Sequence, residues 1–213
     1  MTENASGIIL RTRPLTETSL IVHWLTSAQG RISTVAKGAR RAQSPFRGKL
    51  DLFYFADFSF ARSRRSELHT LREVSIRHTR QPIRQDVKLL QQASYATALI
   101  EHTTEMDTPL PGLFRIFSEF LEALPTQKSG ANLIFSFELK LLEELGMAPD
   151  LPASNLSSGA TEIAVKLLER DFAFTSRIKL STAQTNELRQ FLHGFLIFHL
   201  GKIPSSRTAA LAE

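Results

Sequence analysis

The chain has 213 residues, of which 42% are hydrophobic and 22% charged, as in a folded globular protein rather than a disordered one. Its formal net charge is +5, and it has no cysteine, which excludes disulfides, thiolate nucleophiles and cysteine-ligated metal sites. No apolar run approaches the roughly 18 residues of a membrane span, and the opening MTENASG lacks the form of a signal peptide. We therefore expect a cytoplasmic protein that does not enter a membrane.

The positive charge is concentrated in the first part of the chain. Residues 1–80 contain 14 Lys and Arg against six Asp and Glu, whereas residues 81–213 contain 12 against 15. Most of the first group are Arg, whose planar guanidinium suits phosphate better than an ammonium does. We expect two domains, with a polyanion-binding domain over residues 1–80 and a second domain over residues 81–213.

The first 80 residues carry the patterns of β-strands separated by short turns. These patterns cover residues 7–13, 19–25, 31–36, 49–61 and 67–77. Alternation is clearest in the fourth, where the even-numbered positions from Leu50 to Phe60 are apolar and are expected to face the core. Five short strands predict a small barrel, and the OB-fold is the commonest such barrel that binds oligonucleotides.

The opposite face of the fourth strand carries Phe53 and Phe55, for which two interpretations remain open. These rings could stack on bases, as aromatic side chains do in proteins that bind single strands. They could instead be covered by the second domain. Asp51 and Asp57 flank them and would repel phosphate, which favours the second interpretation.

A basic segment, VAKGARRAQSPFRGK, lies between the third and fourth strands. Between Lys37 and Lys49 it contains five cations, no acid, and the loop-forming residues Gly and Pro. Unpaired cations are almost never fully buried, so we expect an exposed loop that binds a polyanion; an ordinary solvated hairpin loop is the alternative. The predicted contact residues are those of the loop and three more in the strands: Lys37, Arg40, Arg41, Arg47, Lys49, Arg11, Arg13 and Arg31. Another basic turn follows at residues 62–66.

From residue 81 the apolar period changes from two to three or four, which predicts amphipathic helices. They are expected over residues 84–105, 113–124, 131–145, 161–170 and 182–200. Ser181 and Gln184 have the spacing of a capping box that would begin the last helix. Its inward face is expected to contain Leu188, Phe191, Leu192, Phe195, Leu196 and His199. The predicted fold class is α+β, with a five-stranded OB-fold barrel followed by an α-helical bundle.

The chain lacks the common catalytic motifs. It contains no phosphate-binding GxxxxGK[ST] loop, no GxGxxG after a strand, no HExxH and no GxSxG, and its six histidines are scattered. We therefore expect a binding protein that is not an enzyme and that needs no cofactor or metal.

Three stretches of the first domain carry a family resemblance. They read GIILRTRPLTETSLIVHWLTSAQGRISTVAKGARR, FRGKLDLFYFADFSF and ELHTLREV. Over these stretches the chain resembles the N-terminal part of the RecO family of bacterial DNA repair proteins, whose characteristic features are the opening hairpin and the GRxxxVAKGAR segment. Weaker similarity continues in FELKLLEELG and LGKIPSSR, so the resemblance touches the whole chain.

The resemblance implies an OB-fold DNA-binding domain joined to a helical domain with partner-binding and structural roles. It implies binding of single- and double-stranded DNA, annealing of complementary strands, and loading of a recombinase on DNA coated by the single-strand-binding protein SSB. It also implies the partners RecR and SSB, and association with the nucleoid when DNA is bound. Two alternatives remain from the residues alone: an RNA-binding or ribosome-associated OB-fold protein, and a structural adaptor whose basic loop contacts an acidic protein.

Two departures from the family pattern concern the second domain. Many members carry a cysteine-ligated zinc element after the FEL helix, where this chain has PDLPASNLSSGA, so no zinc element is expected. Some members have basic residues just before FEL that help to hold the acidic SSB tail. Here Phe135 and Ser136 occupy that place and Lys140 is the nearest base, so the SSB contact residues are left open.

Overall fold

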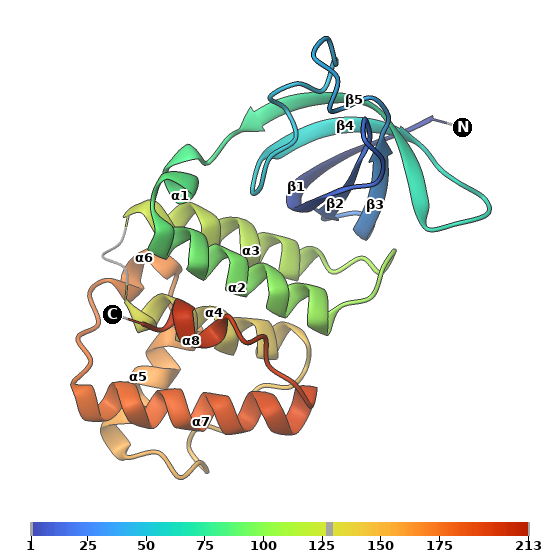
Figure 1. Cartoon of the computed structure of the whole chain (residues 1–213). Coiled ribbons are helices and arrows are strands. Elements are labelled where there is room, and N and C mark those ends of the chain that lie inside the picture. The colour runs from blue at the N-terminus through green and yellow to red at the C-terminus, as the bar shows by residue number, and fades with distance from the viewer. Residues whose placement is uncertain (1, 127–129, 213) are drawn as a thin grey trace. The chain divides into compact units, whose positions relative to one another are not determined.

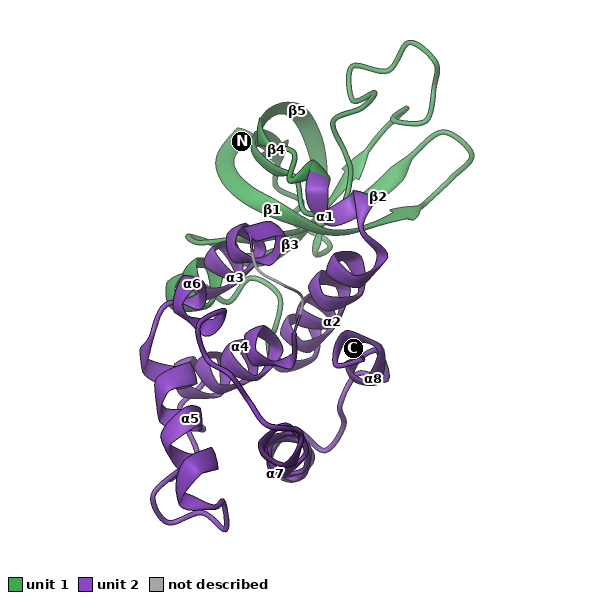
Figure 2. Ribbon diagram, turned by 90° about the vertical axis from the view of Figure 1, so that its left-hand side faces the viewer, with its two compact units in different colours: residues 1–81, 104–115 green, residues 82–103, 116–213 purple. Residues whose placement is uncertain are grey.

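The structure is a computed structural model that describes residues 2–126 and 130–212 (Figure 1). It divides into two compact units (Figure 2). The first unit comprises residues 1–81 together with residues 104–115, and the second comprises residues 82–103 and 116–213. The first unit is thus discontinuous in sequence, because a distant segment joins it.

Five strands form a closed barrel in the first unit, which confirms the predicted α+β class and N-terminal barrel. The strands are β1 (Thr2–Pro14), β2 (Leu20–Thr26), β3 (Gly30–Ala36), β4 (Phe55–Ala61) and β5 (Leu68–His78). Their order around the barrel is β1-β2-β3-β5-β4, with β3 and β5 parallel and the other pairs antiparallel. This is the strand arrangement expected of an OB-fold.

Apolar side chains of alternating strand positions fill the barrel. Trp24 stacks on Phe58 with ring centroids 4.0 Å apart, and its indole N–H donates to the hydroxyl of Thr34. Ala56, Phe58 and Phe60 point into this core, as the alternation of the fourth strand predicted. Aromatic pairs of this kind bury a large apolar surface and so stabilise a small core.

The predicted start of the fourth strand at residue 49 is wrong, because β4 begins at Phe55. The preceding residues form a turn in which the Asp51 carboxylate accepts the backbone N–H of Leu52 at 2.8 Å. Phe53 takes a positive φ of 64°, a conformation that interrupts the alternation of a strand. Its ring is therefore buried, at 1% exposure, instead of pointing away from the core.

Helices make up the second unit and its connections. They are α1 (Gln81–Gln85), α2 (Val87–Thr103), α3 (Pro111–Ala123), α4 (Ala131–Glu144), α5 (Ser158–Glu169), α6 (Phe172–Thr175), α7 (Thr182–Leu200) and α8 (Arg207–Ala210). α4 is the central element, since it contacts α2, α5, α6 and α7. In the described ranges, no helix is long and apolar enough to span a bilayer.

The last long helix, α7, begins as the sequence predicted but buries a narrower face. Ser181 and Gln184 form a complete capping box at its N-terminus. Only the leucines of the predicted inward face are buried, at positions 188, 192 and 196; Phe191 and Phe195 are half-buried. The prediction for His199 is wrong, because His199 is exposed; its ring is tilted against that of Phe195 at a centroid distance of 4.4 Å.

Candidate nucleic-acid interface

The predicted basic segment, called the basic loop below, comprises residues 37–49 between β3 and β4. A chain of tight turns orders its backbone: the N–H groups of Arg41, Ser44 and Arg47 each donate to the carbonyl three residues earlier at 3.1 Å. Gly38 takes a φ of +69°, which a residue with a side chain adopts only at a cost. Four of the five cations are exposed and Lys49 is half-buried, so the loop presents its charge to solvent.

Phe46 holds the middle of the basic loop on the barrel. Its ring is 6% exposed and belongs to the same apolar cluster as Trp24 and Phe58. The loop is therefore not a free hairpin, because moving it would expose this ring. Sequence reasoning missed this anchor, since a single Phe between Pro45 and Arg47 has no periodic pattern around it.

The basic loop is also bonded to the turn between β1 and β2. The backbone N–H of Arg40 donates to the carbonyl of Thr18 at 3.0 Å, and its guanidinium Nη1 donates to the carbonyl of Thr16 at 3.3 Å. Thr16 in turn accepts the N–H of Ser19 through its hydroxyl at 3.1 Å. Arg40 therefore has a structural role besides its charge.

A hollow of about 350 Å³ lies beside these residues. Its lining combines apolar residues with three guanidinium groups and contains no carboxylate: Leu20, Ala39, Arg40, Arg41, Ala42, Phe46, Arg47, Gly48 and Leu50. Concave surfaces lined by one sign of charge concentrate oppositely charged ligands. The structure thus brings Arg40, Arg41 and Arg47 together around one site that suits an anion.

The three predicted residues outside the loop have different surroundings. Arg13 is exposed near the end of β1, one residue before Pro14, and Arg11 is half-buried on the same strand. Arg31, at the start of β3, points to another partner: its Nε donates to the Thr104 hydroxyl at 2.8 Å, and its Nη2 donates to the Thr104 carbonyl. Arg31 therefore holds residues 104–115 on the barrel and is not gathered with the loop cations.

Phe53 and Phe55, which could either stack on bases or be covered by protein, are both partly or fully covered within the first unit. Phe53 is buried, as described above. The ring of Phe55 lies 6.3 Å from His78 and 6.2 Å from Phe114, measured between centroids, and the Arg80 guanidinium lies over it at 6.0 Å. In this arrangement Phe53 offers no surface on which a base could stack.

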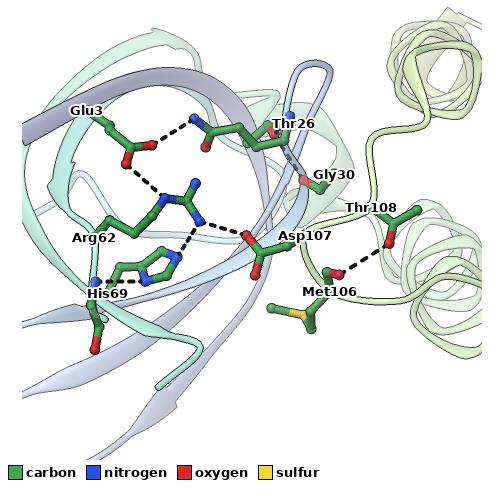
Figure 3. A network of polar contacts seen from close by, with 10 residues as sticks. Glu3, Thr26, Gly30, Arg62, His69, Met106, Asp107 and Thr108 are labelled. Atoms are coloured by element: carbon green, nitrogen blue, oxygen red, sulfur yellow. Dashed lines mark hydrogen bonds and ion pairs between the residues drawn. The ribbon is translucent and has the colours of Figure 1, made fainter. Parts of the chain in front are cut away.

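A polar network around Arg62 links Glu3 of β1, His69 of β5 and Asp107 (Figure 3). Arg62 pairs with Glu3 at 2.8 Å and with Asp107 at 3.0 Å, and its Nη1 lies 3.4 Å from Nε2 of His69. The hydrogen bond from Arg62 lowers the pKa of Glu3 below its usual value. His69 is 2% exposed, and burial together with the charge of Arg62 lowers its pKa. No local pattern in the sequence could have found the two ion pairs, because Glu3 and Asp107 are 59 and 45 residues away from Arg62.

Gly30 lies next to this network and allows residues 104–115 to approach. It takes a φ of +67°, and a Cβ built on it would lie 2.0 Å from the carbonyl oxygen of Thr108. The N–H of Asp107 also donates to the carbonyl of Arg31 at 2.8 Å. Backbone, glycine and Arg31 thus act together to hold this segment on β3.

The described residues 2–126 and 130–212 contain no cluster of three or more metal-ligating side chains. The positions just before FEL, where the resemblance would place basic residues, hold Phe135 and Ser136 here. Phe135 and Ser136 are fully buried, the Ser136 hydroxyl donates to the carbonyl of Leu167, and the Lys140 ammonium donates to that of Leu168. The serine and the lysine thus both bond to backbone carbonyls of α5.

Comparison with known proteins gives a consistent result over both units. The family model described as "Recombination protein O N terminal" matches residues 1–80, and that described as "Recombination protein O C terminal" matches residues 84–161. The "DNA repair protein RecO" of Bacillus pumilus is 30% identical over 208 residues, which cover 93% of this chain and 80% of the relative.

Other relatives with the same description align over shorter stretches. That of Bacillus subtilis is 31% identical over 151 residues, or 71% of this chain and 58% of the relative. That of Tolumonas auensis is 34% identical over 145 residues, or 68% of this chain and 59% of the relative. These two alignments span less than two thirds of the relatives' own length.

Proposed function

Because the chain belongs to the RecO family of DNA repair proteins, we propose that it binds single- and double-stranded DNA through the basic loop. The observation that carries the proposal is an ordered loop with four exposed cations and no acid, held on the barrel by Phe46. A preorganised loop loses little conformational entropy when a phosphate backbone binds to it. The proposal includes Arg11 and Arg13 of β1, whereas Arg31 is left out because its guanidinium is bonded to Thr104.

The mechanism is electrostatic. Lys37, Arg40, Arg41, Arg47 and Lys49 neutralise phosphates and release counterions, so log K should fall with log salt at a slope of about −3.5 for a single strand if all five take part. Neutralising two strands on one surface lowers their mutual repulsion, which promotes pairing. We therefore propose that the protein anneals complementary strands and helps to load the recombinase on SSB-coated DNA.

The domains divide these tasks in the proposal. Residues 1–80 contact DNA, and residues 81–213 bind RecR and SSB and provide structural support. The protein is expected to be associated with the nucleoid when it binds DNA. No catalytic step is part of this mechanism.

The experiment compares the wild-type protein with Lys37→Glu/Arg41→Glu by fluorescence anisotropy on labelled single- and double-stranded oligonucleotides across a salt series. These two residues are chosen because, within the described ranges, neither side chain makes a hydrogen bond that holds the loop, unlike the guanidinium of Arg40. The matched control is Lys179→Glu/Lys202→Glu, which changes the charge equally at exposed positions of the second unit.

The loop variant should bind more weakly by about tenfold or more, with a salt slope reduced by about 1.4. Equal binding by the loop variant and the control would refute the loop assignment. Annealing of SSB-coated complementary oligonucleotides tests the mediator role separately. Preferential binding of RNA in competition at fixed salt would favour the RNA-binding alternative.

A further inference from the structure

A second set of exposed cations lies in the turn between β4 and β5, at residues 62–67. Arg64 and Arg65 are both exposed, and within the described ranges neither forms an ion pair with a carboxylate. This turn was recognised in the sequence as basic but is not used by the DNA contact proposed above. It belongs to the same unit as the basic loop.

Hydrogen bonds order this turn before any ligand binds. The Ser63 hydroxyl lies 3.1 Å from that of Ser66 and accepts the N–H of Arg65 at 3.3 Å. The N–H of Ser63 donates to Nδ1 of the buried His69 at 3.3 Å, and the Ser66 hydroxyl donates to the carbonyl of Leu68. The two guanidinium groups therefore project from a fixed backbone, which reduces the entropic cost of binding.

The neighbouring charges also favour an anion at this turn. Glu3 and Asp107 are the nearby acids, and both are paired with Arg62. Arg62 therefore cancels much of the repulsion that they would exert on a phosphate, while Arg64 and Arg65 stay available. Glu67 is exposed on the same turn and is the remaining acid of the segment.

The turn is distant from the basic loop, as Figure 1 shows by drawing the two apart. The strand β3 runs between the Arg62 network, beside the turn, and the basic loop. At its start the Arg31 carbonyl accepts the N–H of Asp107, the partner of Arg62; at its end Ala36 leads into the basic loop. A strand rises about 3.3 Å per residue, so these two points are separated by about 17 Å along β3.

We propose that the β4–β5 turn is a second phosphate-binding site, in which Arg64 and Arg65 hold a second nucleic-acid strand while the basic loop holds the first. The inference rests on the proposed function, which supplies the first strand and the annealing reaction. Two separate sites would allow both backbones to be neutralised before the strands pair. A single site would require the second strand to approach the charge of the first.

The test uses the full chain and two non-complementary oligonucleotides that carry a donor and an acceptor fluorophore. Energy transfer between them reports two strands on one protein, and anisotropy of one labelled strand alone reports the first site. Arg64→Glu/Arg65→Glu is compared with the wild type and with Lys179→Glu/Lys202→Glu, which carries the same charge change elsewhere. Annealing of complementary strands is measured in the same three proteins.

The expected result is a selective loss. Arg64→Glu/Arg65→Glu should bind the first strand within about twofold of the control, while energy transfer and the annealing rate fall by about tenfold or more. Energy transfer and annealing equal to those of the control would overturn the second site and leave the proposed function intact.

Loss of first-strand binding in Arg64→Glu/Arg65→Glu would also overturn the inference, because the turn would then belong to one continuous path. Absence of DNA binding by the wild type would instead refute the proposed function, and the second site with it. The wild-type measurement therefore separates the two failures.

Discussion

Arg207 and Glu138 form a bidentate ion pair in the interior of the second unit. Nε of Arg207 lies 2.7 Å from Oε1 of Glu138, and Nη2 lies 2.9 Å from Oε2. The hydroxyl of Tyr95 donates to the same Oε1, and burial together with this carboxylate raises the pKa of the tyrosine well above its usual value. Glu138 and Arg207 come from the two short stretches of the second domain that resembled the RecO family, so this pair accounts structurally for one residue in each.

Breaking this pair on one side should destabilise the protein strongly. Arg207→Met leaves the Glu138 carboxylate buried without its main partner, which should lower the free energy of unfolding by about 3–5 kcal/mol. The double variant Glu138→Gln/Arg207→Met should be closer to the wild type, because no charge remains buried. Urea denaturation at neutral pH measures both. Glu162→Gln, which removes the exposed pair with Lys166, is the control and should change little. A single variant as stable as the wild type would contradict the prediction.

Removing the anchor of the basic loop should affect stability and DNA affinity together. Phe46→Ala creates a cavity in the barrel core, which should lower the free energy of unfolding by about 3 kcal/mol. The loop cations would then be less well positioned, so affinity for a single strand should also fall. Phe198→Ala is the matched control because that ring is 83% exposed. If Phe46→Ala unfolds like the control, the ring does not anchor the loop.

Substitutions of Arg31 and Arg13 should have different effects, because Arg31 has a structural role and Arg13 is proposed to bind DNA. Arg31→Ala removes the hydrogen bonds to Thr104 and should lower the melting temperature with little change in the salt dependence of DNA binding. Arg13→Ala should keep the melting temperature and reduce the salt slope by about 0.7, the value for one phosphate contact on a single strand. If Arg31→Ala instead kept the melting temperature and reduced the salt slope, Arg31 would be a DNA-binding residue.

His69 should make the stability of the first unit depend on pH. Burial and Arg62 lower its pKa below the usual value of 6.5, so the unfolded chain takes up the proton first as the pH falls. The stability contributed by the neutral ring is thus complete above about pH 6.5 and is lost as the pH falls toward the lowered pKa. The pKa values of Glu3 and Asp57 are lowered from 4.5 and 3.8, so their losses occur at still lower pH.

His69→Asn tests this dependence, since its amide oxygen can replace Nδ1 as the acceptor for the N–H of Ser63. Urea midpoints measured between about pH 5 and pH 7 should fall less steeply for this variant than for the wild type. His193→Asn, at an exposed position, should keep the wild-type slope. A wild-type slope in His69→Asn would show that another group controls the titration.

Local patterns predicted much of the fold, and distant partners explain what they missed. Alternation placed Phe58 and Phe60 in the core, and the spacing of Ser181 and Gln184 placed the start of α7. Charge and glycine content predicted that the basic loop is exposed. No local pattern indicates that Phe53 takes a positive φ, because its N–H donates to the carbonyl of the distant Ile9 at 2.8 Å.

In the candidate site, too, some residues could be predicted from local sequence and others depend on distant partners. The loop arginines could be chosen from their charge alone, because an exposed cation needs no particular partner. Arg31 bonds to Thr104, which is 73 residues away, so its charge alone could not indicate this structural contact. The residues that hold a site in place are thus the ones that a sequence predicts least well.

The attachment of residues 104–115 to β3 has a consequence for how the protein is made. Thr108 covers Gly30, and Thr104 and Asp107 bond to Arg31, so one side of the barrel is completed by a segment that follows α2 in the chain. On the ribosome the five strands emerge first, and this covering segment emerges only after the first long helix of the other unit. Translation must therefore pass these residues before that side of the closed barrel is covered, and in a fragment that stops at residue 80 it would be exposed to solvent.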